Sequence, residues 1–182
     1  ANGRNEPLDV GIAGKQIVEV AAEIPAGTAA QVVDVRGCIV TPGIIDMHTH
    51  VFMLFPKPEG SVDSLHADAH LLASGVTTTV DAGTAGWKNF MDFKTGSVDR
   101  SRVRILAFLN IAGEGMIGNT SEQDIADMNP HIAAAVAAAF PELIVGIKTA
   151  HYWTRLPWDA EHPPWASVER AVEAGTLCSK PV

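Results

Sequence analysis

The chain has 182 residues, of which 47% are hydrophobic and 19% are charged, so it can bury a sizeable core and is not a disordered protein. Its formal net charge of -8 argues against nonspecific binding to nucleic acid or to anionic membranes, and we expect neither as a partner. Cys38 and Cys178 lie too far apart in sequence to indicate a disulfide framework or a zinc knot.

The first 42 residues have the pattern of a small all-β unit. Short β-prone runs at residues 8–13 and 16–20 flank Gly14 and Lys15, which predicts a hairpin. Residues 31–35 and 38–40 predict two further strands. Proline and glycine at positions 42 and 43 then predict a turn that leads out of the unit.

From residue 44 onward, the pattern alternates between strands and helices. Strands are predicted at residues 44–48, 76–81, 103–110 and 143–148, and helices at residues 61–74, from 87 onward, at 130–140 and at 165–178. Residues 81–86, 111–121 and 149–164 are predicted to be loops. Four successive β-α units predict an α/β fold with a parallel sheet, right-handed crossovers and strands buried on both faces.

Polar residues stand at the carboxyl ends of all four predicted strands, which form the functional face in folds of this kind. They are His48 and His50, Asp81, Asn110 and Lys148. The two histidines alternate on one strand and therefore share a face, so their imidazoles can hold one metal ion.

Lys148 has two interpretations. A lysine that ends a buried strand is costly unless it is paired, neutral or modified. It either extends its amine to the rim of the sheet or, as a neutral amine, reacts with carbon dioxide to form a carbamate that bridges two metal ions.

Other residues are candidates for supporting or binding roles. We expect Asp46 to support the histidines by hydrogen bonding, Asp81 either to orient a ligand or to cap the next helix, and Asn110 to act similarly. His151, Tyr152 and Arg155 follow Lys148 at the predicted mouth, where they suit substrate binding, with Arg155 as a carboxylate clamp. We expect Trp153 and Trp158 to pack.

Three segments together resemble the amidohydrolase superfamily. They are Gly43 to Val51, Gly75 to Gly86, and Val145 to Lys148, preceded by the small β unit. The combination resembles the dihydroorotase/hydantoinase-like branch, and in particular its amidohydrolase/deacetylase metalloenzymes. It spans nearly the whole chain.

The resemblance implies a (β/α)8 TIM barrel with a small β-sandwich built from both chain ends. Residues 1–42 would then be a portion of the sandwich and residues 43–182 the N-terminal half of the barrel, with its first four β/α units. Two divalent metal ions, usually zinc, are implied, with His48 and His50 on one and carboxylated Lys148 bridging both. Further histidines and a proton-shuttling aspartate would lie beyond Val182.

The implied activity is hydrolysis of amide, cyclic amide or ester bonds by metal-activated hydroxide, on a carbon–nitrogen bond other than a peptide bond, with a small-molecule substrate. The alternatives are a metal-dependent phosphoesterase and a non-catalytic barrel fragment that only binds or assembles. The β unit and Lys148 argue against the phosphoesterase.

We expect the chain to be truncated at both ends and inactive alone, because it begins without Met and stops where a fifth strand is expected. Four parallel strands expose two open edges, so the rest of the barrel or another subunit, such as a copy in a homo-oligomer, is expected as a partner. We expect a cytoplasmic location, although a signal preceding Ala1 would not be visible.

Overall fold

A computed structural model describes residues 6–118, 120–152, 158–160 and 162–182. The chain divides into two compact units, Ala1–Pro42 and Gly43–Val182. None of the helices in these described ranges has both the length and the apolar character that crossing a membrane requires.

The first unit contains one antiparallel hairpin. Its strands, β1 (Asp9–Ala13) and β2 (Gln16–Ala21), pair across Gly14 and Lys15, which confirms the predicted hairpin. Gly14 has a φ of 61°, the left-handed conformation that a two-residue hairpin turn requires and that glycine adopts without strain.

The two further strands predicted in this unit are not present, and this prediction was wrong. Residues 31–35 and 38–40 form no strand, and their apolar side chains are exposed, with Val32 at 64% and Ile39 at 91%. A β-prone run is stabilised by pairing and by burial of one face. In the described part of the unit, neither is available to these residues.

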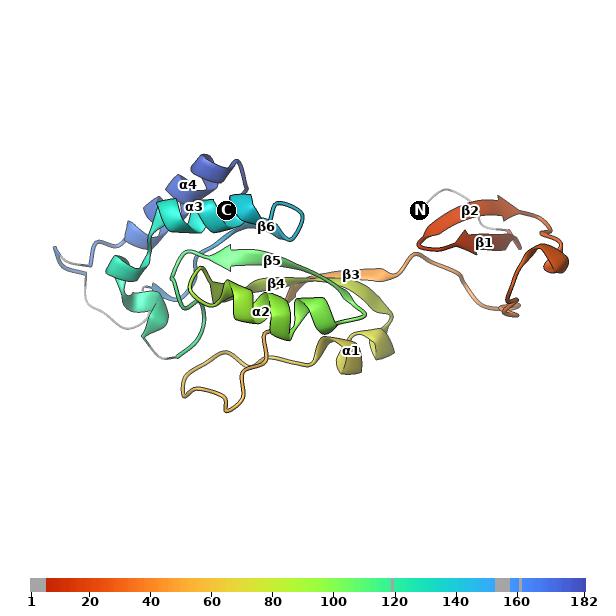
Figure 1. Cartoon of the computed structure of the whole chain (residues 1–182), viewed down its shortest axis with the longest axis horizontal. Helices are drawn as coiled ribbons and strands as arrows, with labels where there is room; N and C mark the ends of the chain where they lie inside the picture. The colour runs from red at the N-terminus through yellow and green to blue at the C-terminus, as the bar shows by residue number, and fades with distance from the viewer. Residues whose placement is uncertain (1–5, 119, 153–157, 161) are drawn as a thin grey trace. The chain divides into compact units, whose positions relative to one another are not determined.

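The second unit is an α/β structure with one parallel sheet in the order β3-β4-β5-β6 (Figure 1). The strands are β3 (Ile44–Thr49), β4 (Val76–Gly86), β5 (Arg104–Asn110) and β6 (Ile144–Lys148). Each strand pairs with the next one along the chain, so the four carboxyl ends lie at one edge of the sheet. The predicted α/β class and parallel sheet are confirmed.

In the described residues, four α-helices follow the strands in turn. They are α1 (Ala67–His70), α2 (Phe90–Gly96), α3 (Pro130–Ala139) and α4 (Ala166–Cys178). Helix α3 begins as the sequence predicts, because the Asn129 side chain accepts the backbone N–H of Ile132 (3.1 Å) and Pro130 occupies the first turn.

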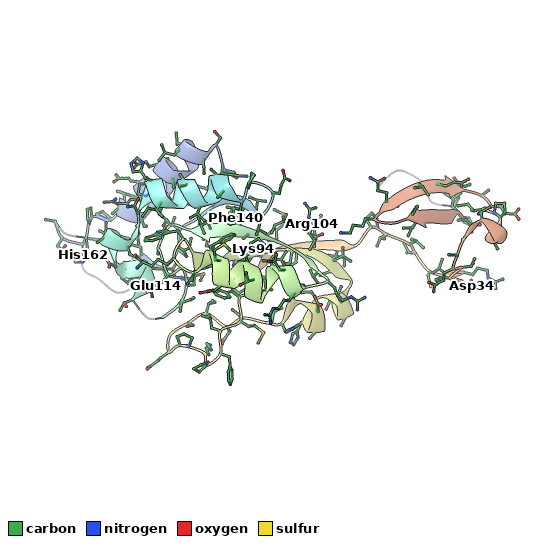
Figure 2. All side chains as sticks on the ribbon, viewed as in Figure 1. Asp34, Lys94, Arg104, Glu114, Phe140 and His162 are labelled. Carbon is green, nitrogen blue, oxygen red and sulfur yellow. The ribbon has the colours of Figure 1, made fainter. Side chains whose placement is uncertain are left out.

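One face of the sheet packs on the helices. On β5, Ile105, Ala107 and Leu109 are buried, whereas Leu106 and Phe108, which point the other way, are only partly buried. The covered face continues into an aromatic cluster, in which the ring of Phe90 lies 5.3 Å from that of Phe140 (labelled in Figure 2) and 6.0 Å from that of Phe93.

Two element predictions in this unit were wrong. The helix predicted at residues 61–74 is reduced to α1 and a 3₁₀ helix, Leu72–Ser74. The preceding backbone is held in a non-helical course because Val62 N–H donates to Met116 O (3.2 Å) and Leu65 N–H to His50 O (2.9 Å). The loop predicted at residues 81–86 instead continues β4 to Gly86.

Candidate metal centre

The carboxyl end of β3 carries the predicted histidine pair. His48 is exposed and His50 is partly buried, with ring centroids 5.6 Å apart and ring planes at 85°. Asp46, two residues before His48, accepts the backbone N–H of His48 through Oδ1 (3.1 Å). Asp46 therefore lies next to the pair and fixes its backbone.

A chain of hydrogen bonds fixes the ring of His50. The Thr84 hydroxyl donates to Oδ2 of Asp81 (3.0 Å), and Thr84 Oγ1 lies 2.8 Å from Nδ1 of His50. Because the hydroxyl proton is directed to the carboxylate, Oγ1 accepts the Nδ1–H of His50. That tautomer leaves Nε2 with a lone pair, which is the form in which a histidine binds a metal ion.

Asp81 is fully buried, at 0% exposure, and is held by backbone as well as by Thr84. Val51 N–H donates to its Oδ2 (2.8 Å) and Thr84 N–H to its Oδ1 (2.7 Å). Burial raises the pKa of Asp81, and these hydrogen bonds oppose that rise because they stabilise the ionised form. Asp81 caps no helix, since α2 begins only at Phe90.

Lys148 ends β6 and is paired in register with Asn110 on β5. Its side chain lies across Gly83, where a Cβ would be only 2.5 Å from Lys148 Cγ. Gly83 also has a φ of 87°, so both the space and the backbone require glycine there. Asn110 Nδ2 donates to Gly83 O (3.0 Å) and thereby fixes the backbone that the lysine crosses.

The pKa of His50 identifies the charges that surround it. Burial lowers this pKa most; the charges of Asp81 and Glu122 raise it, and those of His48 and Lys148 lower it. Charges act on one another strongly only at short range. The contacts agree with this: His50 lies against His48 and reaches Asp81 through Thr84, and Asn110 joins Glu122 to Gly83, across which Lys148 lies. These residues form one cluster at the carboxyl edge of the sheet.

The predicted substrate-binding residues in the loop after β6 differ in their exposure to solvent. The side chain of His151 is 54% exposed, and its backbone has a φ of 45°. Tyr152 is 1% exposed and belongs to the hydrophobic core, with its ring 5.7 Å from that of Trp158. Its burial favours a packing role, and the predicted substrate contact stays a prediction. Arg155 lies outside the described residues.

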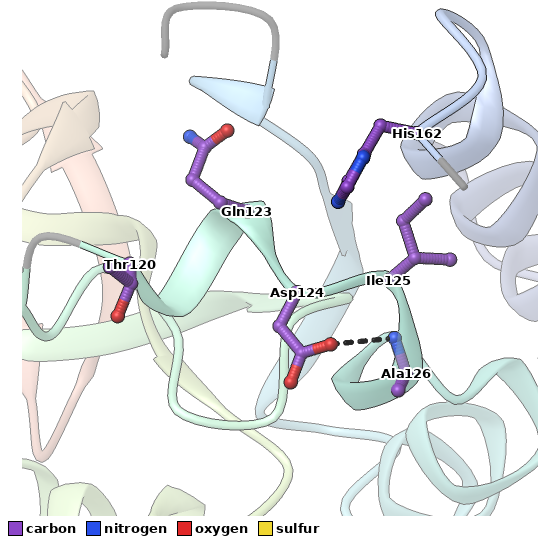
Figure 3. Close-up of a pocket in the computed structure, with 6 residues that line it drawn as sticks. All are labelled: Thr120, Gln123, Asp124, Ile125, Ala126 and His162. Atoms are coloured by element: carbon purple, nitrogen blue, oxygen red, sulfur yellow. Dashed lines mark hydrogen bonds between the residues drawn. The ribbon is translucent and has the colours of Figure 1, made fainter. Parts of the chain in front are cut away.

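A cavity of about 430 Å³ adjoins the segment that follows β5 (Figure 3). Its lining residues are Thr120, Gln123, Asp124, Ile125, Ala126 and His162. The Asp124 carboxylate accepts the backbone N–H of Ala126 (2.9 Å), so it serves the local turn. None of His48, His50 and Lys148 lines this cavity, which is therefore distinct from the candidate metal centre.

The residues present fit part of a metal centre. Within the ranges that the structure describes, no three His, Cys, Asp or Glu side chains converge to hold a metal ion. His50 nevertheless presents Nε2 in the correct tautomer, and Gly83 leaves room for the Lys148 side chain. The donor chemistry therefore suits one histidine pair and one lysine of a larger ligand set.

Three residues near the site were not indicated by the sequence pattern: Thr84, Glu122 and Gln123. Thr84 had a usable signal, because an aspartate three residues before a threonine often accepts its backbone N–H in a turn. Glu122 and Gln123 had none, since they lie between the loop predicted at residues 111–121 and the helix predicted at residues 130–140, where no element was predicted. Their burial, at 7% and 9% exposure, depends on tertiary packing.

No protein-family model matches the chain. A deacetylase from Agrobacterium fabrum is 33% identical over 137 residues, which cover 73% of this chain and 32% of that protein. A dihydroorotase from Streptococcus pyogenes is 41% identical over 78 residues, which cover 42% of this chain and 17% of that protein. A solved dihydroorotase structure matches with a TM-score of 0.75 and 27% identity, over 98% of this chain and 46% of that one.

The chain spans about a third of the length of the curated relatives that it matches. Proteins named deacetylase and dihydroorotase agree with the branch that the sequence motifs resemble. The motif histidines and Lys148 also lie at one edge of a parallel sheet, as that resemblance implies. The chain belongs to the amidohydrolase superfamily.

Proposed function

We propose that this chain contributes the first part of the active site of a metal-dependent hydrolase that acts on amide, cyclic amide or ester bonds. The observation that carries the proposal is the arrangement around His50. Its Nδ1 is engaged by Thr84, its Nε2 is in the metal-binding form, and Lys148 acts on its pKa from the end of β6. The relatives named deacetylase and dihydroorotase support action on carbon–nitrogen bonds.

In this proposal, His48 and His50 would hold one divalent ion. Lys148, whose neutral amine would react with carbon dioxide to give a carbamate and release a proton, would supply an anionic ligand shared with a second ion. Zinc is the proposed metal, because imidazole and oxygen donors suit it. When bound, such ions lower the pKa of a water molecule and polarise the substrate carbonyl. The remaining metal ligands and a proton-shuttling aspartate are proposed to lie outside this sequence.

The chain's own residues orient and support this centre. Asp81 and Thr84 hold the His50 ring in one tautomer, and Asp46 holds the backbone of His48. Asn110 fixes the backbone of Gly83, across which Lys148 lies. Each of these contacts defines where a donor atom sits before a metal or substrate arrives, which is how preorganised sites gain affinity.

The same proposal assigns the architecture around the site. The sheet would be the first half of a (β/α)8 barrel, and the hairpin of the first unit would belong to a small β-sandwich. Strand β3 supports this, because Ile44, Ile45 and Met47 on the sheet's edge strand are exposed at 54%, 62% and 70%. An edge strand with exposed apolar side chains is stabilised when another strand pairs with it and covers those side chains. That strand would come from the rest of the barrel or from another subunit.

Metal analysis of the full-length protein tests the proposal. We expect about two zinc-like ions per chain and hydrolysis of N-acyl amino acids, cyclic amides or esters. A chelator should abolish this hydrolytic activity, and added metal should restore it. His48→Ala should abolish hydrolysis with little loss of folding stability, because His48 is exposed. His70→Ala, which removes an exposed histidine at the end of α1, is the matched control and should keep full activity.

A folded and active enzyme without metal would contradict the proposal. Turnover of aryl phosphates in preference to every amide and ester would instead favour the metal-dependent phosphoesterase. Folding without any hydrolytic activity in the metal-loaded full-length protein would favour a non-catalytic role.

A further inference from the structure

Glu122 is a buried acid to which the proposed metal centre assigns no role. Its side chain is 8% exposed and lies in a 3₁₀ helix, Ser121–Gln123, in the segment that follows β5. Its Oε1 accepts a hydrogen bond from Asn110 Nδ2 (3.0 Å), and its Oε2 lies 2.7 Å from Nδ1 of His151. A buried carboxylate needs such partners, because an unpaired charge in the protein interior is strongly unfavourable.

The network around Glu122 fixes the direction of each hydrogen bond. Asn110 Oδ1 accepts the backbone N–H of Ala112 (3.0 Å), so its Nδ2 is the nitrogen that donates to Gly83 O and to Glu122. An ionised carboxylate only accepts, so Nδ1 of His151 is the donor of the second bond. Glu122 therefore receives one hydrogen bond on each oxygen, from two neighbours that both donate.

His151 is held at its backbone as well as at its ring. Gln123 Nε2 donates to the carbonyl oxygen of His151 (2.6 Å). The φ of 45° at His151 is a left-handed conformation that a residue other than glycine adopts at an energetic cost, and that persists where surrounding contacts enforce it. Two consecutive side chains thus hold one half-exposed histidine three residues beyond Lys148.

We propose that Glu122 is a positioning residue that orients the His151 imidazole at the mouth of the metal centre, where His151 contacts the substrate. This rests on the proposed hydrolase function. The position of His151 supports it, since the backbone N–H of Ile111 donates to Lys148 O (2.8 Å) and so fixes the end of β6 from which the loop leaves. Asn110, which donates to Glu122, also donates to Gly83 O, and the Lys148 side chain lies across Gly83.

A merely structural Glu122 would hold the loop by burial alone, and Glu122→Gln separates the two roles. Glutamine has nearly the same shape but offers one acceptor and one donor. It therefore cannot accept hydrogen bonds from both Asn110 Nδ2 and His151 Nδ1, whichever way its amide turns. The substitution therefore breaks the Nδ1–H hydrogen bond or forces the His151 ring into its other tautomer, while it keeps most of the packing.

The test is a double-mutant cycle in the metal-loaded full-length protein, with an N-acetyl amino acid as substrate. Glu122→Gln and His151→Ala should each raise KM by about tenfold, with kcat changed by less than about threefold, because uniform substrate binding is lost. The double variant should be no worse than His151→Ala alone, since Glu122 acts through that ring. Glu114→Gln, at an exposed position of the same β5–α3 connection (labelled in Figure 2), is the control and should behave as wild type.

Additive effects in the double variant would overturn the proposal, as would a KM unchanged by His151→Ala. A second measurement does not depend on activity or on folding of the variants. In the wild type labelled with ¹⁵N-histidine, nuclear magnetic resonance should show Nδ1 of His151 protonated, and an unprotonated Nδ1 would overturn the positioning contact. A wild type that hydrolyses nothing would defeat the proposed function and the substrate contact, while the ¹⁵N result would still decide whether Glu122 holds the ring.

Discussion

The side chain of Lys148 crosses the backbone of Gly83 so closely that a Cβ at position 83 would lie 2.5 Å from Lys148 Cγ and 2.8 Å from its Cβ. Strand β4 thus shapes the space available to the last residue of β6, although one strand lies between them in the sheet. The glycine is part of the site because it determines where the lysine can go.

Gly83→Ala should therefore damage both stability and metal binding. The new methyl group must displace the lysine stem, and an alanine at a φ of 87° is strained, so we expect a loss of about 2–4 kcal/mol in the free energy of unfolding. Urea unfolding of the full-length protein measures this. Gly96→Ala is the control: its added Cβ meets no atom within 4 Å apart from its chain neighbours and its own helix backbone, and a gain of up to about 0.5–1 kcal/mol is expected at this last residue of α2.

Thr84→Val should weaken metal binding without creating a cavity in the core. Valine fills the same volume but cannot accept from His50 Nδ1 or donate to Asp81, so the imidazole loses its fixed tautomer. We expect metal affinity to fall by about 10–100-fold, measured by competition with a chelator. Thr95→Val removes an exposed hydroxyl that bonds only to Met91 O within α2 and should leave the affinity unchanged.

Modification of Lys148 can be observed directly. If its amine carries a carbamate, ¹³C-bicarbonate should give one carbamate signal in the metal-loaded full-length protein. Lys148→Arg should abolish the signal, because a guanidinium stays protonated and does not react. Lys180→Arg changes a partly buried lysine that donates to Pro141 O, and this variant should retain the signal. A carbamate signal that persists in Lys148→Arg would contradict the prediction.

Asp68 should stabilise the fold in a pH-dependent manner. Its carboxylate accepts hydrogen bonds from Ser101 Oγ (2.6 Å) and from the backbone N–H groups of Arg102 and Val103, which tie α1 to the start of β5. The Ser101 hydroxyl, above all, lowers the pKa of Asp68 from its ordinary value of 3.8. The stabilisation is therefore present above pH 3.8 and is lost as the pH falls through the lower folded-state pKa.

Asp68→Asn should accordingly be less stable than wild type at neutral pH, and the difference should shrink as the pH falls below 3.8. Thermal unfolding at a series of pH values measures it. Glu142→Gln, at an exposed turn before β6, serves as the control and should follow the wild type at every pH. A difference between Asp68→Asn and wild type that grows on acidification would have the wrong sign.

Much of the parallel sheet could be predicted because its strands are continuous apolar or β-branched runs that end at glycine or polar residues. The predicted strand starts at 44, 76, 103 and 143 lie within one residue of the observed ones. The failures occurred where local pattern lacked tertiary support. Residues 61–66 have helical spacing, but the backbone N–H groups of Val62 and Leu65 donate to Met116 O and His50 O instead.

Only those residues of the candidate site that lie at the carboxyl ends of strands could be predicted from the sequence. His48, His50, Asp81 and Lys148 were indicated because parallel strands bring their carboxyl ends together. Glu122 was not, because nothing in a glycine-rich connection predicts that one acid is buried against Asn110 and His151. Tyr152 was predicted to contact the substrate because it follows a strand end, where an aromatic residue fits both a binding-site mouth and a core.

The burial of Tyr152 has a practical consequence for optical work. It is the only tyrosine in the 182 residues, and burial together with the charge of Asp159 raises the pKa of its phenol. In an alkaline titration of this chain, tyrosinate absorbance therefore reports on a single phenol adjacent to His151. The alkaline onset of that absorbance measures how readily the segment beside the candidate site opens to solvent.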